Sequence, residues 1–342
     1  MPPPLPDMAE VPDGALPEPR SYVERPCVQK AVDDLIKPED PRAPYTIVGM
    51  GGGGKTVLAS AVVRKQSVRE HFRGGIFWME VGRRVKKNKL LSLLKPLARE
   101  MGAAPTDAPH GVPHVFDNLE QVKQHLTTVA STGTSPRLVV LDDVWEREVV
   151  DTLLPLGLKL LVTTRDRSVV GAPGGCLELG DMTEDEALEL LLKTSMTVGQ
   201  PGDDVLTQMT KVVTLCGRLP LVLAVAGAMP VVKGKGLTAG AWEDLIEEFE
   251  NVAKKMDAGG EDSHSLGLVL ETSLTALPVR KKEEFKKMAV LAAGAVAPIE
   301  MLCNLWQTQD VGGTREGADD LVSKCLLQDM GHGGYRVHDL IL

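Results

Sequence analysis

Short apolar runs alternate with longer stretches of helical periodicity through the first half of the chain. The runs that read as strands occupy residues 45–48, 76–81, 137–141 and 159–163. Helical patterns lie between the second and third of these, around residues 90–101 and 115–130. Strands that alternate with helices are typical of βαβ units. The pattern therefore predicts a parallel sheet with helices on both faces over residues 21–181.

The second half of the chain is predicted to be mainly helical. Thr183 lies three residues before Glu186, which is the signature of a capping box at a helix start. Further helices are expected at residues 203–216, 219–228 and 241–255, then at 266–276, 281–292, 299–306 and 315–324. Residues 251–265 read as a linker, and "CLLQDMGHGGYRVHDL" reads as a hairpin. We expect a helical domain over residues 182–258 and a winged-helix domain over residues 259–342.

Composition and charge narrow the class of protein. The 342 residues are 43% hydrophobic and 25% charged, as in ordinary soluble domains. The net charge of −9 argues against nucleic-acid binding, which usually demands a basic face. The five cysteines are scattered, and no apolar run approaches the length of a membrane span. Residues 1–20 are proline-rich without a signal-peptide core, so we expect a disordered tail and a cytoplasmic protein.

The stretch "GMGGGGKT" lies between the first predicted strand and a helix. It fits the phosphate-loop pattern G-x-x-x-x-G-K-[ST]. Such a loop turns backbone N–H groups toward phosphate oxygens, and the helix that follows adds its positive dipole end. The alternative is a flexible glycine linker, which the strand and helix on either side disfavour. The residues predicted to bind nucleotide here are Gly49, Gly51, Gly52, Gly53, Gly54, Lys55, Thr56 and Val57.

Two later strands end in residues that complete such a site. "RLVVLDDVW" runs into Asp142, a candidate magnesium ligand with Thr56, and Asp143, a candidate base for an attacking water. "LKLLVTTRD" ends in Thr164 and Arg165. In an open parallel sheet, ligands lie at this carboxyl edge. We therefore expect Thr164 to bind the nucleotide and Arg165 to sense a γ-phosphate.

Six motifs in order resemble the NB-ARC signalling ATPases. They are "GMGGGGKT", "IFWMEV", "LVVLDDVW", "KLLVTTRD", "CGRLPLVLAVAG" and "YRVHDL". This family includes plant disease-resistance proteins and the animal apoptosome scaffold. The resemblance covers about residues 21–342 and implies a P-loop domain, a helical domain and a winged-helix domain that close over ADP.

The resemblance also implies roles for four residues outside the P-loop sheet. Val23 and Arg25 in "YVERP" would border the adenine, Pro220 in "GRLPL" would pack on the nucleotide, and His338 in "VHD" would reach the ADP β-phosphate. Two positions depart from the usual pattern, with Arg218 replacing a glycine and Val337 replacing a methionine.

The leading hypothesis is a switch that binds ADP and ATP with Mg²⁺. ADP would hold the closed resting state, and ATP would drive opening and self-association, or association with related proteins, in immune or cell-death-like signalling. Weak ATPase activity would reset it. Two alternatives stay open: a turnover P-loop ATPase or kinase, and a non-signalling protein or fragment that binds full-length relatives. The family usually carries sensor repeats and an N-terminal signalling domain, which are not found between Met1 and Leu342.

Overall fold

The computed structural model divides the chain into two compact units. It describes residues 8–37, 43–83, 87–102, 116–132, 135–169, 174–195, 201–232, 238–253, 261–292, 295–338 and 341. The first unit consists of Met1–Glu18 and Glu24–Gly180, and the second of Pro19–Val23 and Asp181–Leu342. Each unit is described by itself below.

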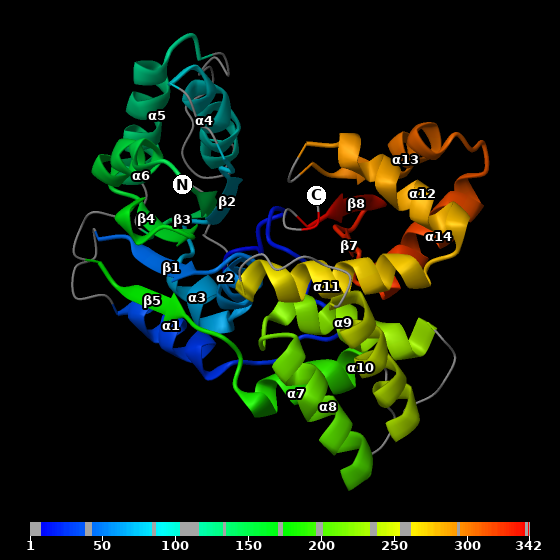
Figure 1. Ribbon diagram of the computed structural model, residues 1–342. Helices are drawn as coiled ribbons and strands as arrows, with labels where there is room; N and C mark the ends of the chain where they lie inside the picture. Colours follow the sequence, from blue (N-terminus) through cyan, green and yellow to red (C-terminus); the bar gives the residue numbers. More distant parts are fainter. Residues whose placement is uncertain are drawn as a thin grey trace. The chain divides into compact units, whose positions relative to one another are not determined.

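The first unit is built on a five-stranded parallel sheet with the order β2-β3-β4-β1-β5 (Figure 1). Its strands are β1 (Tyr45–Gly49), β2 (Ile76–Glu80), β3 (Leu138–Val144), β4 (Lys159–Thr164) and β5 (Cys176–Leu179). The four strands expected from the apolar runs are all present. Strand β5 was not expected, because it has four residues and one of them is Glu178.

Helices cover both faces of this sheet (Figure 1). They are α1 (Pro26–Ile36), α2 (Lys55–Arg64), α3 (Gln66–His71), α4 (Lys87–Gly102), α5 (Leu119–Thr132) and α6 (Arg147–Leu153), with 3-10 turns at Leu154–Leu156 and Arg167–Val169. Val139 and Leu141 of β3 belong to the apolar cluster formed with α4, α5 and α6. Leu138 and Val140 are equally buried and alternate with them, so they face the side of α2. The expected α/β architecture is confirmed.

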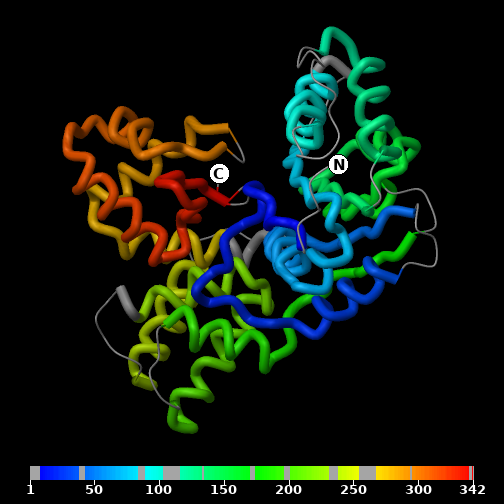
Figure 2. The backbone as a smooth tube through the Cα atoms, turned by 180° about the vertical axis from the view of Figure 1, so that it is seen from behind, coloured from blue at the N-terminus to red at the C-terminus, as the bar shows by residue number. Residues whose placement is uncertain are grey.

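Residues 8–18 pack on the first unit, which corrects the expectation of a disordered tail to residue 20. Ala9, Ala15 and Leu16 are buried, and the Leu16 N–H donates to Ser60 Oγ of α2 at 3.0 Å. Arg69 Nε of α3 donates to Ala9 O at 2.7 Å. In Figure 2 this dark blue segment runs beside α2 and α3. Its small apolar residues are buried by surfaces distant in sequence, which proline content alone does not reveal.

The second unit is helical with one small sheet. Its helices are α7 (Glu184–Thr194), α8 (Asp203–Leu215), α9 (Pro220–Val232), α10 (Ala239–Ala253), α11 (Glu261–Ala276), α12 (Val279–Lys287), α13 (Ile299–Trp306) and α14 (Val311–Ser323), with a 3-10 turn at Met288–Val290. Strands β6 (Ala297–Pro298), β7 (Leu327–Asp329) and β8 (Gly334–Val337) form an antiparallel sheet with the order β6-β8-β7. Thr183 and Glu186 form the expected capping box.

Two expectations for the second unit need comment. The linker expected over residues 251–265 is helical at both ends, because α10 continues to Ala253 and α11 begins at Glu261. The domain boundary expected at residue 258 lies outside the described residues. Across the described ranges, no helix combines the length and the apolar character that crossing a membrane would require.

Candidate functional site

The glycine-rich loop joins β1 to α2 through backbone geometry that other residues tolerate poorly. Gly52 and Gly54 have φ of 76° and 91°, in the left-handed region that glycine adopts without strain. A Cβ at Gly49 would lie 2.8 Å from the Leu179 carbonyl oxygen of β5, so a side chain there would clash with backbone. Between these positions, the Gly53 N–H donates to Met50 O at 3.3 Å. The loop is therefore tightly curled.

Helix α2 starts directly from this loop. The first intrahelical bond runs from the Leu58 N–H to Gly54 O at 2.8 Å. Gly54 is the N-cap residue and has no side chain to cap the helix. Since the first N–H groups of a helix have no intrahelical partner, those of Lys55, Thr56 and Val57 are suited to an anion.

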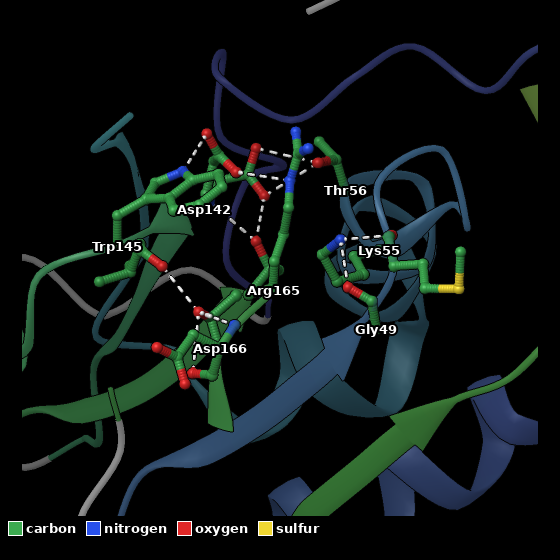
Figure 3. Close-up of polar contacts among 12 residues, drawn as sticks. Gly49, Lys55, Thr56, Asp142, Trp145, Arg165 and Asp166 are labelled. Atoms are coloured by element: carbon green, nitrogen blue, oxygen red, sulfur yellow. Dashed lines mark hydrogen bonds and ion pairs between the residues drawn. The ribbon is translucent and has the colours of Figure 1, made fainter. Parts of the chain in front are cut away.

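Lys55 is a buried cation at the mouth of the loop. Its Nζ donates to Gly49 O at 2.9 Å and to Met50 O at 2.8 Å, as Figure 3 shows. The pKa of Lys55 is lowered to about 8: burial is the largest cause and the charge of Arg165 the next, while Asp143 and Asp142 act in the opposite direction. An ammonium group has three donors, so one N–H remains for a further acceptor beyond these two carbonyls.

Asp142 of β3 meets Thr56 of α2 across 86 residues of sequence. Thr56 Oγ1 lies 3.0 and 3.1 Å from the two carboxylate oxygens of Asp142. On the other side, Thr163 Oγ1 of β4 donates to Asp142 Oδ1 at 2.6 Å. A hydroxyl and a carboxylate converging in this way are the oxygen donors that Mg²⁺ prefers, so these residues fit the metal expected beside a bound nucleotide.

Asp143 is turned away from Asp142 by an irregularity in the sheet. The register between β3 and β4 shifts between Leu141 and Val144, and Asp143 has φ of 53°. Its backbone N–H donates to Thr163 Oγ1 at 2.9 Å, and its Oδ2 accepts from Trp145 Nε1 at 2.9 Å. The two adjacent carboxylates therefore have different partners, and their roles as metal ligand and as base stay predictions.

Arg165 follows β4 and lies beside Asp143. Its Nε is 3.8 Å from Asp143 Oδ1, and its guanidinium carbon is 5.1 Å from the centroid of the Trp145 ring (Figure 3). This Nε is buried and has no hydrogen-bond partner within the described ranges. A buried donor of this kind is suited to an incoming acceptor, because leaving it unpaired is costly.

Thr164 has a different environment from the one expected. It is fully buried, and its Oγ1 donates to Val144 O at 2.7 Å and accepts from the Asp166 N–H at 3.0 Å. These contacts fix the ends of β3 and β4 to each other. They do not support the expectation that Thr164 contacts the nucleotide.

The remaining predicted residues do not all belong to the first unit. Arg25 does, and its Nη2 donates to Gly180 O at 3.2 Å. Val23 is buried in the apolar cluster of the second unit, Pro220 opens α9, and His338 follows β8. The contacts expected between these three residues and a nucleotide stay predictions.

Thr163 and Trp145 are site residues that sequence reasoning missed. Thr163 joins both aspartates through one hydroxyl, and Trp145 joins Asp143 to Arg165. The available signal was their place in the motifs "TTRD" and "DDVW", each next to a residue already selected.

Comparisons with known proteins agree with this geometry. The sequence profile of the NB-ARC domain matches residues 25–199. Apoptotic protease-activating factor 1 of Homo sapiens is 26% identical over 343 residues, covering 96% of this chain and 26% of that protein. A probable disease resistance protein of Arabidopsis thaliana is 26% identical over 301 residues, covering 82% of this chain and 32% of that protein.

A solved structure shares the fold. It is a signal transduction ATPase with numerous domains (STAND) that has a tetratricopeptide repeat sensor, from Pyrococcus horikoshii. The TM-score is 0.59 at 17% identity, over 96% of this chain and 42% of that one. The chain spans about a quarter to a third of the length of the two curated relatives described above.

Proposed function

Because the chain belongs to the NB-ARC family, we propose that it is a switch operated by adenine nucleotides. The observation that carries this proposal is the meeting of Lys55, Thr56 and Asp142 at the carboxyl edge of one parallel sheet. Ligands of open α/β sheets bind at that edge. A buried cation beside oxygen donors for a metal suits the phosphates of ADP or ATP with Mg²⁺.

The loop and the start of α2 would hold the phosphates. The N–H groups from Gly51 to Val57, apart from that of Gly53, which donates to Met50 O, would donate to phosphate oxygens. The third N–H of Lys55 would reach the β- and γ-phosphates. Thr56 and Asp142 would hold the magnesium ion, whose charge offsets that of the phosphates. Arg25, next to the start of α1, would border the adenine together with Val23.

Hydrolysis would use the neighbouring pair of residues. Asp143 would orient a water molecule and accept its proton as the water oxygen bonds to the γ-phosphorus and the bond to ADP breaks. Arg165 would donate from its buried Nε toward the γ-phosphate. A guanidinium that meets only the γ-phosphate distinguishes ATP from ADP.

The conformation of the second unit would depend on whether ADP or ATP is bound. We propose that α12, α13 and α14 with strands β6, β7 and β8 form a winged-helix module and that the preceding helices form the helical domain. Pro220 would pack on the nucleotide, and His338 would donate to the ADP β-phosphate. The closed form would then bind ADP better, and a ligand shifts an equilibrium only by such a difference in affinity. ATP would favour an open form that self-associates.

The experiment is to identify the nucleotide released when the purified protein is denatured and then to measure ATP turnover. A switch releases close to one ADP per chain and turns ATP over slowly. Rapid multiple turnover would indicate a metabolic ATPase or kinase. Release of no nucleotide, together with no binding of added ADP or ATP, would contradict the proposal. Co-purification with a longer relative would favour the interaction-protein alternative.

A further inference from the structure

We propose that Trp145 is a positioning residue that serves two groups at once: its ring holds Arg165 and its N–H orients Asp143. This inference rests on the proposed function and deepens it. It assigns the discrimination of ATP from ADP and the speed of hydrolysis to two separable parts of one indole.

The first part is the indole N–H. Trp145 Nε1 donates to Asp143 Oδ2 at 2.9 Å, and Asp143 has the strained φ of 53°. A non-glycine residue keeps such a backbone conformation only when its surroundings fix it. The N–H bond fixes the carboxylate, while Thr163 fixes the backbone N–H. Trp145 thus determines where the carboxylate points.

The second part is the ring face. The guanidinium carbons of Arg165 and Arg83 lie 5.1 and 4.5 Å from the ring centroid. Two cations gathered on one ring repel each other, and the negative π face reduces that cost. Arg83 follows β2 and Arg165 follows β4, so both reach the ring at the carboxyl edge of the sheet. The ring therefore holds Arg165 in place although its Nε lacks a hydrogen-bond partner among the described residues.

Charge explains why this arrangement favours a triphosphate. Lys55 interacts with Arg165, Asp143 and Asp142, so the cluster also includes this cation and the second carboxylate. With Arg83 and Arg165, its three cations outnumber its two carboxylates and leave an excess positive charge. Arg165 is 19% exposed, as is Asp143, so solvent screens the pair only in part. A terminal phosphate brings the negative charge that this cluster lacks, and ADP does not extend as far.

The test compares Trp145→Phe with Trp145→Leu. Phenylalanine keeps an aromatic face and loses the N–H, whereas leucine loses both. The control is Trp306→Phe, since Trp306 also has a cation over its ring, Lys281 at 5.9 Å, but its Nε1 has no partner within the described ranges. Each variant is measured for single-turnover hydrolysis and for affinity toward ADP and a non-hydrolysable ATP analogue, both with Mg²⁺.

The proposal predicts that the two effects separate. Trp145→Phe should slow hydrolysis roughly ten- to hundredfold, the range for losing a hydrogen bond to a charged group, and should keep the ratio of analogue to ADP affinity. Trp145→Leu should slow hydrolysis as much and should also lower that ratio roughly two- to thirtyfold, the range of a cation–π contact. Trp306→Phe should change neither quantity.

Three outcomes would overturn the proposal. Hydrolysis at the unmutated rate in Trp145→Phe would contradict the N–H role, and an unchanged affinity ratio in Trp145→Leu would contradict the ring role. Loss of the ratio in Trp306→Phe would show that the effect is not specific to this ring. If the leucine variant does not fold, the hydrolysis rate of the phenylalanine variant decides. A wild-type protein that binds neither nucleotide would overturn the proposed function itself.

Discussion

Two buried threonines beside the candidate site bond differently from three buried threonines of the second unit. In the second unit, Thr194, Thr272 and Thr314 each donate to the carbonyl four residues earlier, within the same helix or, for Thr314, at its N-cap residue. In the first unit, Thr163 and Thr164 instead join separate strands. The same chemistry is local in one unit and connects distant segments in the other. The hydroxyl of Thr163 thus connects the two aspartates of the site, whereas the three threonines of the second unit only satisfy their own hydroxyl groups.

The largest expected effect is on the hydrolysis rate and comes from Asp143, whose backbone N–H bonds to Thr163. Asp143→Ala should slow hydrolysis roughly a hundred- to ten-thousandfold, as expected for removing a general base, and should spare nucleotide binding. Asp142→Ala, one residue away, should instead weaken magnesium-dependent binding. Single-turnover assays and calorimetry with and without Mg²⁺ separate these effects. If both variants fail in the same step, the different partners of the two carboxylates have no functional meaning.

The next effect concerns Lys55. Lys55→Ala removes the buried cation of the loop and should weaken ADP and ATP binding by roughly 2–5 kcal/mol, as when one member of a buried charge pair is lost. Calorimetry measures it directly, with Lys211→Ala as a control on the exposed part of α8. Affinities equal to those of the unmutated protein would rule out the loop as a phosphate site.

The His338→Ala substitution tests whether His338 of the second unit contributes a polar group to the nucleotide site. A hydrogen bond to a charged group contributes roughly 1.5–3 kcal/mol. Its loss should speed ADP release about tenfold to a hundredfold, since about 1.4 kcal/mol corresponds to one decade. Stopped-flow release of a fluorescent ADP analogue reports the rate, and light scattering reports self-association. An unchanged release rate would rule out a contact between His338 and the bound ADP.

The smallest expected effect is on the free energy of unfolding and comes from a matched pair of threonine substitutions. Thr163→Val leaves the Asp143 N–H without its acceptor and should cost roughly 1–3 kcal/mol of unfolding free energy. Thr272→Val removes a hydroxyl that bonds only within its own helix and should cost roughly 1 kcal/mol or less. Urea denaturation compares the two. Equal losses would mean that linking separate elements adds nothing to stability.

The sequence was informative where its signals were local. The apolar runs predicted β1 to β4, and the residues at the ends of these strands predicted the edge where Lys55, Thr56 and Asp142 meet. Glycine spacing predicted the curl of the loop, because a phosphate loop needs backbone conformations that other residues resist.

The contacts that could not be predicted from the sequence depend on strand register and on burial between segments distant in sequence. The contacts of Thr163 and Trp145 follow from the register shift between β3 and β4 and from the positive φ of Asp143. Neither feature can be inferred from the amino-acid sequence. Residues 8–18 were misread because their proline content suggested disorder, whereas Leu16 and Ala9 are bonded to α2 and α3. The composition of a segment does not indicate which surface of the protein the segment packs against.

The assignment of residues 19–23 to the second unit has a topological consequence. The chain passes from one unit to the other after Glu18, after Val23 and again after Gly180. Lys193 Nζ of α7 donates to Tyr22 O at 2.6 Å, next to the passage after Val23. Arg25 donates to Gly180 O, at the passage after Gly180. A protease that cut only after Gly180 would leave a fragment whose residues 19–23 still belong to the other unit. The two units are thus interleaved along the chain, and three backbone connections join them.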